Sequence, residues 1–152
     1  MKRAVTMAGV FLAGLALGSG ALGVKAASAR KYVNLPGRAV TAPFSDAVLV
    51  GDTLYLAGRI GLVPGTREVP ATAEEEARNV LDQFKAVLAE AGMSMDDLVS
   101  VQVFCSDVKL FDTWNKVYPA YFGKELPARA FIGSGPLLFG ARFEMPAIAV
   151  RR

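Results

Sequence analysis

Residues 72–92 read TAEEEARNVLDQFKAVLAEAG, and this segment has the clearest secondary-structure pattern in the chain. Apolar residues recur at steps of three and four, as on one face of an amphipathic helix: Ala77, Val80, Leu81, Phe84, Val87, Leu88 and Ala91. Thr72 and Glu75 have the spacing of an N-terminal capping box, and Gly92 offers a left-handed residue that ends a helix. We expect the carboxylates at 74–76 to be solvated groups at the positive end of the helix dipole.

Two strands are predicted before this helix. Residues 45–50 and 53–58 are rich in apolar side chains, and the Gly51-Asp52 pair between them has the composition of a tight hairpin turn. Residues 61–70 contain two prolines and predict a loop. The N-terminal part of the fold is therefore expected to be a β-hairpin, a loop and then the helix.

Residues 98–106 alternate between two faces, as expected of a strand that is covered on one side. The face predicted to lie under the helices carries Val99, Val101, Val103 and Cys105, and the other face carries Ser100, Gln102, Phe104 and Ser106. Cys105 is the only cysteine, so it cannot form an intrachain disulfide. We expect it to be a small buried side chain rather than a nucleophile.

A second helix is predicted over residues 110–122, with its aromatic side chains toward the core. Pro119 lies inside this segment and removes one backbone N–H, which predicts a kink or an early end. Residues 128–133 and 142–150 are predicted to be strands separated by a loop at 134–141.

The predicted order is therefore strand, strand, helix, strand, helix, strand, strand. Strand-helix-strand units imply parallel neighbouring strands with right-handed crossovers, so both helices should cover one face of a single sheet. The opposite face of residues 98–106 is too mixed for a dry core and too apolar for plain solvent exposure. We expect a second copy of the chain to cover it.

Residues 1–29 have the three parts of a secretory signal peptide. A basic start is followed by an apolar run over residues 4–24, and Ala-Ser-Ala at 27–29 supplies a small-x-small cleavage sequence. A retained membrane anchor is the alternative, since the run is nearly long enough to span a bilayer. The glycines in the run favour cleavage. The mature protein is predicted to be periplasmic or secreted, with an N-terminal arm at 30–42 and one domain at 43–152.

The 152-residue chain has 17 Lys and Arg against 14 Asp and Glu, a formal net charge of +3. All of this excess lies in the leader, because Lys2, Arg3 and Lys25 are basic and no residue of the leader is acidic. The mature chain keeps 14 residues of each sign, and its basic residues are scattered among acids. Nucleic-acid binding needs clustered Lys and Arg. We therefore expect neither nucleic acid nor, after cleavage, a membrane as partner.

The chain contains no histidine. This excludes Ser/His and Cys/His nucleophiles, an imidazole general base and histidine-rich metal sites. No carboxylate cluster has metal-ligand spacing, and no glycine-rich phosphate loop follows a strand. We expect neither a metal nor a cofactor, so any catalysis has to use carboxylates, Arg, Lys, Tyr, hydroxyls or backbone groups.

Arg129 and Glu144 are charged residues inside two of the predicted apolar strands. A charge on a mostly buried strand costs several kcal/mol unless it is paired or used. The two side chains could form a plain ion pair that fixes the sheet, lie on a face exposed to solvent, or act together on a ligand. The pattern of residues leaves these alternatives open.

Short segments along residues 42–152 match the pattern of a known family. The most specific part is Pro-Ala-Arg at 127–129, followed by Glu144 and by Ala-Ile-Ala-Val at 147–150. Further matching pieces are residues 43–48, 56–60 and 77–92, Val103-Phe104 with Asp107, and Phe111 with Asn115, Val117 and Tyr118. In these pieces the chain resembles the RidA/YjgF/UK114 (Rid) family of enamine and imine deaminases.

The resemblance implies an α+β, chorismate-mutase-like fold with a mixed sheet of about six strands and two helices on one face, assembled as a homotrimer with clefts between subunits. In such proteins the arginine matching Arg129 grips the carboxylate of a 2-imino or 2-enamino acid. The glutamate matching Glu144 positions the water that attacks the imine carbon. By the same resemblance, Asn115 belongs to the substrate-binding set, and the backbone near Gly58 and Phe131 lines the cleft.

Three pocket positions depart from the family pattern, because Phe44, Ala57 and Phe131 stand where many relatives have Tyr, Ser and Cys. The more apolar pocket suggests an imine with a larger or more hydrophobic side chain. The expected function is hydrolysis of reactive 2-enamino and 2-imino acids to 2-keto acids and ammonia. The alternative is a non-catalytic module that binds small carboxylates or keto acids in the same cleft. Ribonuclease activity, attached to some relatives, is disfavoured by the lack of histidine and of a basic patch.

Overall fold

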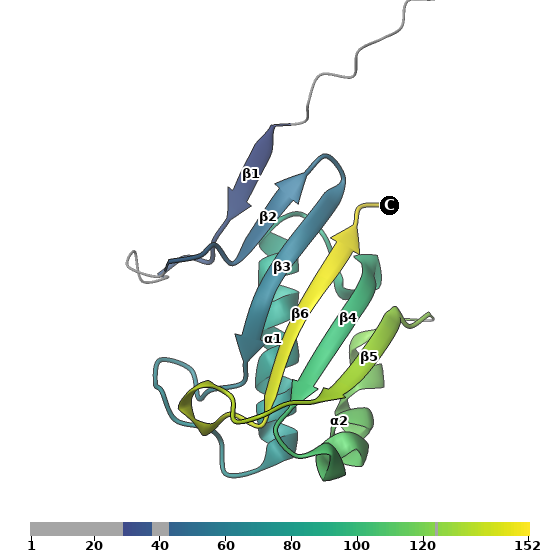
Figure 1. Ribbon diagram of the computed structural model, residues 1–152. Coiled ribbons are helices and arrows are strands. Elements are labelled where there is room, and N and C mark those ends of the chain that lie inside the picture. The colour runs from purple at the N-terminus through teal and green to yellow at the C-terminus, as the bar shows by residue number, and fades with distance from the viewer. Residues whose placement is uncertain (1–28, 38–42, 124) are drawn as a thin grey trace, which may run out of the picture.

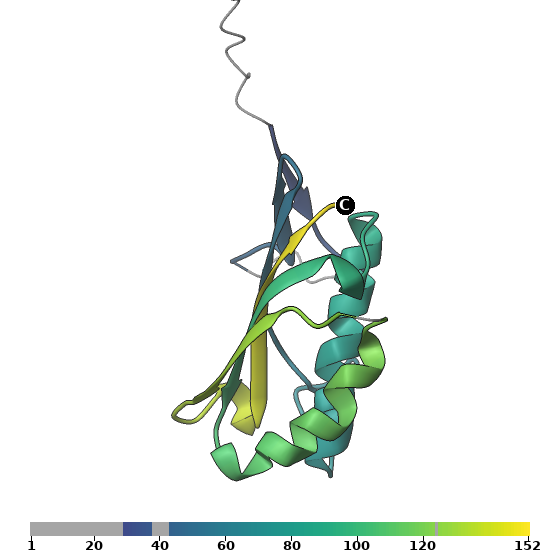
Figure 2. The ribbon, with the colours of Figure 1, turned by 90° about the vertical axis from the view of Figure 1, so that its right-hand side faces the viewer.

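The computed structural model describes residues 29–37, 43–123 and 125–152. A mixed sheet of six strands carries two helices on one face, as the sequence analysis predicted (Figure 1, Figure 2). The strands are β1 Arg30–Val33, β2 Ala47–Val50, β3 Thr53–Ile60, β4 Leu98–Cys105, β5 Ala128–Gly133 and β6 Phe143–Val150. The predicted signal peptide lies outside the described residues except for Ala29. Within these ranges, no helix is both long enough and apolar enough to cross a membrane.

The long helix α1, Ala73–Glu90, forms where the apolar periodicity predicted it. The Thr72 hydroxyl accepts a 3.2 Å hydrogen bond from the backbone N–H of Glu75, which caps the first turn. Gly92 follows the helix with φ of +69°, a conformation that costs glycine little. The buried face packs on the sheet through fully buried side chains, including Val80, Leu81, Phe84 and Leu88.

The strand order β1-β2-β3-β6-β4-β5 differs from the expected topology at one place. We expected the strands on either side of each helix to be neighbours, and this is confirmed for β4 and β5, which pair in parallel. It is wrong for β3 and β4. The last strand, β6, lies between them and is antiparallel to both, so β3 and β4 run parallel to each other without pairing. Because β6 is central, its side chains on the helix side must be apolar. Phe143, Met145 and Ala149 lie on that side and are 0% exposed.

The predicted hairpin is confirmed, since β2 and β3 pair antiparallel around Gly51-Asp52. The N-terminal arm adds a strand that was not predicted. Residues of β1 pair antiparallel with β2, so that Val33 lies opposite Ala47, and Val33 is 2% exposed. One apolar side chain at the end of a polar segment therefore attaches the arm to the edge of the sheet.

Strand β4 alternates as predicted from Val101 onward, but its first residues do not. Val99 was assigned to the helix-covered face and is instead 45% exposed, whereas Leu98 is 4% exposed. The cause is a register shift against β6. Leu98 pairs with Ala149 and Ser100 pairs with Ile148, so β4 advances by two residues while β6 advances by one. Such a bulge reverses the side-chain alternation on one side of it. Cys105 is fully buried as expected, and burial raises the pKa of its thiol.

The second helix, α2, spans Phe111–Val117 and is shorter than the predicted segment. A 3-10 turn, Tyr118–Tyr121, continues the chain and contains Pro119. The early end predicted from this proline is therefore confirmed. Trp114 and Tyr118 are the buried members of the aromatic stripe, at 0% and 2% exposure, while Phe111 remains 43% exposed.

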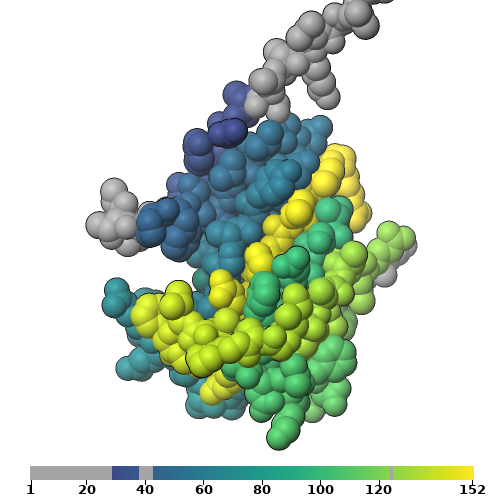
Figure 3. Space-filling model, viewed as in Figure 1, coloured from purple at the N-terminus to yellow at the C-terminus, as the bar shows by residue number. Residues whose placement is uncertain are grey.

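No helix covers the opposite face of the sheet in a single chain, and the segment between β5 and β6 crosses one end of this face (Figure 3). Tyr55 lies on this face, paired with Val48 on one side and with Ile148 on the other, and it is 52% exposed. Ser100 continues the row from Ile148 to the next strands. This face is mostly apolar with few polar groups, which agrees with the composition read from the sequence.

Glu76 is a correction to the expected solvated role of the first-turn carboxylates of α1. Its side chain is 0% exposed and forms a 2.8 Å ion pair with Arg142. The same carboxylate accepts hydrogen bonds from the backbone N–H groups of Arg142, at 2.6 Å, and Phe143, at 3.0 Å. Arg142 also donates to the carbonyl of Pro70. A glycine at position 61 is required here, because any Cβ would collide with the Glu76 backbone carbonyl.

We expect Glu76→Gln to lower the free energy of unfolding by about 3 kcal/mol, since it breaks a buried ion pair and leaves Arg142 without its anion. Urea denaturation at one fixed protomer concentration measures the change. Glu75→Gln, a substitution one residue away on the exposed surface of α1, is the matched control and should change stability by less than about 0.5 kcal/mol. Equal effects of the two substitutions would contradict the role of Glu76.

Candidate functional site

Arg129 lies in β5, the strand at one edge of the sheet, with its side chain on the helix side. Its register partner in β4 is Val101, which is 1% exposed in the core under the helices. Its Nη2 donates a 2.7 Å hydrogen bond to Oδ1 of Asn115 on α2. The guanidinium carbon lies 4.6 Å from the centroid of the Tyr118 ring, a cation–π distance. The α2 segment therefore fixes the orientation of this guanidinium.

Among the described residues, Arg129 has no carboxylate partner, in contrast to Arg59, Arg78 and Arg142, which each pair with an acid. Asn115 is neutral and takes one of the N–H groups of Arg129. A guanidinium with only a neutral partner keeps its full charge and a planar fork for an incoming carboxylate. The resemblance also placed Asn115 in the site, and in the structure this residue is a direct contact of Arg129.

Tyr118 forms the wall beside this guanidinium. It is 2% exposed, and its hydroxyl has no hydrogen-bond partner within the described part of the chain. Burial raises the pKa of Tyr118 to about 12, and the nearby charge of Arg129 offsets only part of this rise. The phenol is therefore neutral at physiological pH, and the guanidinium faces an uncharged ring.

Phe131 lies two residues after Arg129 on β5 and so points to the same side of the strand. Its ring meets the ring of Phe111 edge to face, with centroids 5.1 Å apart. The Phe111 ring is also 5.9 Å from the guanidinium carbon of Arg129. One cation thus lies next to a pair of aromatic rings where α2 packs beside β5.

Glu144 lies in β6 on the opposite, helix-free face of the sheet. Its neighbours Phe143 and Met145 are both 0% exposed under the helices, and alternation points Glu144 the other way, where it is half-buried. Its carboxylate lies over Gly58 of β3. A Cβ at position 58 would collide with Glu144 Oε1, so glycine leaves the space that the carboxylate occupies.

Arg129 and Glu144 therefore lie on opposite faces of the sheet within one chain. The ion pair between them, one of the alternatives from the sequence, is not formed. Asn115 and Phe131 accompany Arg129 on the helix side, and Gly58 accompanies Glu144 on the other side. One chain does not bring the two halves of the predicted site together.

A bulge in β3 explains how Gly58 reaches Glu144. Leu56 pairs with Ala147, but Arg59 pairs with Met145, so three steps of β3 match two steps of β6. Ala57 and Gly58 form this irregularity opposite Pro146. Proline has no N–H to give to the ladder, and within a central strand it is tolerated at a bulge. The sequence contained this signal, a proline in the middle of a predicted strand, although no bulge was predicted from it.

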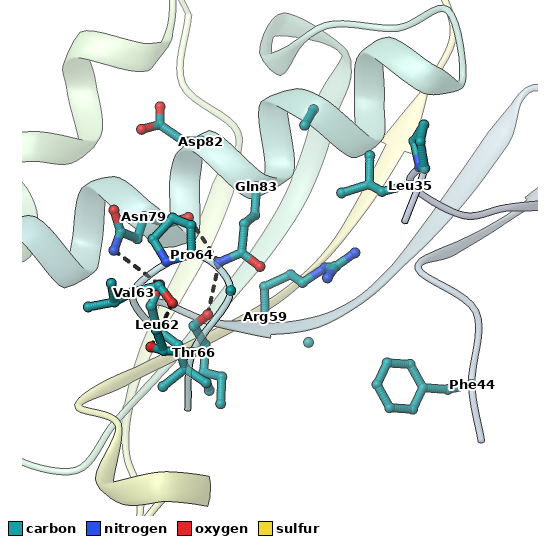
Figure 4. Close-up of a pocket in the computed structure, with 15 residues that line it drawn as sticks. Leu35, Phe44, Arg59, Leu62, Val63, Pro64, Thr66, Asn79, Asp82 and Gln83 are labelled. Carbon is teal, nitrogen blue, oxygen red and sulfur yellow. Dashed lines mark hydrogen bonds between the residues drawn. The ribbon is translucent and has the colours of Figure 1, made fainter. Parts of the chain in front are cut away.

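The bulge also turns Arg59 toward the helix side, where its guanidinium forms a 2.8 Å ion pair with Asp46. Asp46 is 2% exposed and also accepts a 2.8 Å hydrogen bond from the backbone of Leu35. Arg59 points into a hollow of about 730 Å³ between β3, the 61–66 loop and α1 (Figure 4). Phe44 and Gly58 line the same hollow, and Phe44 is 56% exposed.

Sequence reasoning missed Glu76 and Asp46 as buried, charge-paired residues. The available signal was their partners, because Arg59 and Arg142 are charged residues at the ends of apolar strands and so require nearby acids. No group of three or more metal-ligating side chains occurs within the described ranges.

The single helical layer on a mixed sheet, with a carboxylate-free arginine at the sheet edge, defines a small α+β protein of the Rid type. The family model described as endoribonuclease L-PSP matches residues 36–151. The chain belongs to this family, the RidA/YjgF family that the sequence resembles.

Proteins of known name and structure agree with this assignment. The mouse 2-iminobutanoate/2-iminopropanoate deaminase is 38% identical over 114 residues, which cover 74% of this chain and 84% of the mouse protein. A RutC family protein of Pyrococcus abyssi is 38% identical over 110 residues, 72% of this chain and 87% of the archaeal one. The structure of the Escherichia coli YjgF gene product superimposes with a TM-score of 0.74 at 34% identity and covers 80% of this chain and 99% of its own.

We expect alkaline pH to destabilise the protein through Tyr118. Because the folded state holds the pKa of this phenol near 12 and the unfolded state near 10, the neutral form stabilises the fold below pH 10. This stability is lost as the pH rises from 10 to about 12, and amounts to about 3 kcal/mol for Tyr118. Urea unfolding across that range measures it, and Tyr118→Phe should show a smaller decline. An identical decline in both proteins would contradict the buried, neutral phenol.

Proposed function

We propose that the protein hydrolyses reactive 2-enamino and 2-imino acids to 2-keto acids and ammonia. The observation that carries this proposal is the half-buried Arg129, which is oriented by Asn115 and has no acid among the described residues to neutralise it. Support also comes from relatives named 2-iminobutanoate/2-iminopropanoate deaminase in mouse, cattle and rat, each 38% identical to this chain. A further relative of 31% identity, Escherichia coli TdcF, has been solved with bound serine, an amino acid whose carboxylate is of the proposed ligand class.

Arg129 would bind the substrate carboxylate. Its planar fork matches the two carboxylate oxygens, and Asn115 and Tyr118 hold it in one orientation before the ligand arrives. Binding the carboxylate fixes the adjacent imine carbon relative to the site, which removes part of the entropic barrier to attack by water.

Glu144 would position and deprotonate that water. As the water oxygen bonds to the imine carbon, the C=N π pair moves to nitrogen, and the carboxylate takes the proton from the water. The same proton is then delivered to nitrogen. Glu144 would then take the proton of the carbinolamine hydroxyl and pass it to the amino nitrogen. As the C–N bond breaks, its electron pair leaves with ammonia and the C=O bond of the keto acid forms. The balance is one water consumed for one ammonia released, with no redox change and no need for histidine.

The site would be completed by assembly. Since Arg129 and Glu144 lie on opposite faces of one sheet, both can reach one substrate only if they come from different subunits. The uncovered, mostly apolar face that carries Tyr55 and Glu144 is the surface that we expect to pack against a neighbour. We propose a homotrimer with three clefts, each formed by the Arg129 side of one subunit and the Glu144 side of the next.

We expect the mature protein to accelerate ammonia release from imines that an amino-acid oxidase generates in situ. Arg129→Ala should lower kcat/KM by about 100-fold or more, because the substrate carboxylate loses a charge-assisted bidentate contact. Glu144→Gln should lower kcat to a similar extent, because the amide cannot accept the water's proton. Wild-type rates in Arg129→Ala would refute the mechanism. Saturable, Arg129-dependent binding of keto acids without turnover would indicate the non-catalytic binding module instead.

Mixing the two inactive variants provides the control for the shared cleft. If each site takes its arginine and its glutamate from different subunits, some clefts of a mixed trimer contain both intact residues. In an equal mixture refolded together this is about a quarter of the clefts, so activity should return to at most about a quarter of the wild-type value. If both residues act from one chain, the mixture stays inactive.

We also propose that residues 1–29 direct export, so that the protein acts in the periplasm or outside the cell. Expression of the full chain in a bacterial host, followed by fractionation and N-terminal sequencing, tests this proposal. A mature N-terminus near residue 30 in the periplasmic fraction supports it, and an intact leader on cytoplasmic protein contradicts it.

The family's name also includes an endoribonuclease activity. The residues of this chain favour imine hydrolysis, because no histidine is present to serve as acid or base. In addition, Arg59, Arg78 and Arg142 are each neutralised by an acidic partner and cannot form a phosphate-binding stripe.

A further inference from the structure

We propose that the preferred substrates are 2-imino acids with a large apolar side chain, branched aliphatic or aromatic, and that Phe131 is the residue that selects them. This inference rests on the proposed function and names its substrate class. The surface that would receive the side chain consists of Phe131, Phe111 and Val108, and we call it the apolar groove.

The apolar groove begins where the carboxylate site ends. α2 runs alongside β5 in the opposite direction, so that Asn115 and Tyr118 meet Arg129, and Phe111 meets Phe131. Arg129 and Phe131 lie two residues apart on one side of an extended strand, which separates them by roughly 7 Å. A carboxylate seated on Arg129 therefore has its α-carbon and side chain within reach of the Phe131 ring.

The groove continues past Phe131 without a polar group of its own strand. The next residue of β5 on that side is Gly133, and a Cβ there would lie 2.9 Å from Cγ1 of Val108. The absence of a side chain at 133 lets Val108 lie over the end of the strand. Guanidinium, aromatic ring and valine methyl thus follow one another along a single line.

Two sides of the Arg129 guanidinium are already occupied. Asn115 takes Nη2 of the guanidinium on the α2 side, and the Tyr118 ring lies against it at 4.6 Å. Tyr118 has almost no exposed surface, at 2%, so it offers no room for a ligand, whereas Phe111 is 43% and Val108 is 56% exposed. Among the aromatic neighbours of the cation, the accessible one therefore belongs to the apolar groove.

The groove is also preformed, since the edge-to-face packing of Phe111 on Phe131 holds both rings without a ligand. On a rigid apolar wall, each ligand methylene that reaches the wall makes the binding free energy more favourable. A methyl group that is too short to reach the wall gains little. Hydrophobic pockets of this kind discriminate between ligands that differ by one or a few carbons by about 10- to 200-fold. Phe111, the ring that packs on Phe131, also lies 5.9 Å from the guanidinium carbon of Arg129, so the apolar wall adjoins the proposed carboxylate site.

The test compares imines generated in situ from alanine, leucine and phenylalanine. In wild type we expect kcat/KM for the leucine or phenylalanine imine to exceed that for the alanine imine by about tenfold or more. Phe131→Ala should reduce this ratio by about tenfold. Phe139→Ala is the control, because it removes the same side chain from the loop after β5, outside the apolar groove, where Phe139 is 51% exposed, and the ratio should stay at the wild-type value. Phe131→Leu, which keeps an apolar side chain of nearly the same volume, serves if Phe131→Ala fails to fold.

Calorimetric binding of the corresponding keto acids separates the two proposals. Tighter binding of 4-methyl-2-oxopentanoate or phenylpyruvate than of pyruvate, lost in Phe131→Ala, supports the apolar groove even if no imine is turned over, which would refute the deaminase proposal alone. Turnover with equal or greater preference for the alanine imine would overturn the groove alone. A ratio unchanged in Phe131→Ala, or keto acids that bind without regard to side-chain size, would overturn it as well.

Discussion

The buried carboxylate of Glu76 is the contact on which the remaining architecture depends. Through Arg142 and Phe143 it joins the first turn of α1 to the start of β6, and Arg142 also binds the loop before α1 at Pro70. Removing a carboxylate from water is costly, and two backbone N–H groups together with a guanidinium compensate for it here. Because the N–H donors belong to Arg142 and Phe143, the contact fixes where β6 begins. It thereby determines which residues of β6 face the helices and which face outward, including Glu144.

Much of the fold could be predicted from the sequence because its helices and strands have strong local signals. The apolar period of α1, the Gly51-Asp52 turn and Pro119 each act within a few residues, and each prediction is confirmed. The insertion of β6 between β3 and β4 could not be predicted in this way, since strand order depends on contacts between residues far apart in the chain. The bulge that exposes Val99 likewise depends on its register against a distant strand.

The candidate site shows the same division between local and distant information. Arg129 and Asn115, named from family resemblance, are in direct contact, and the guanidinium also lies beside Phe111 of α2 and Tyr118 of the 3-10 turn that follows it. The sequence did not show that Arg129 and Glu144 point to opposite faces of the sheet. The face of each residue depends on how β5 and β6 pair with β4, and the pairing of β6 with β4 could not be predicted. Pro146 could have indicated the bulge at Gly58, since a proline in a central strand removes one ladder hydrogen bond.

The central place of β6 has a consequence for the order in which the protein can fold. A hairpin of β2 and β3 and the β4-α2-β5 unit can form early, but they cannot join into one sheet until β6 lies between them. The pairings of β6 with β3 and β4 can therefore form only after every other strand of the sheet has been synthesised. Until then the edges of β3 and β4 that β6 covers remain open, so deletion of residues 143–152 would leave β1-β2-β3 and β4-β5 without a hydrogen-bonded strand between them.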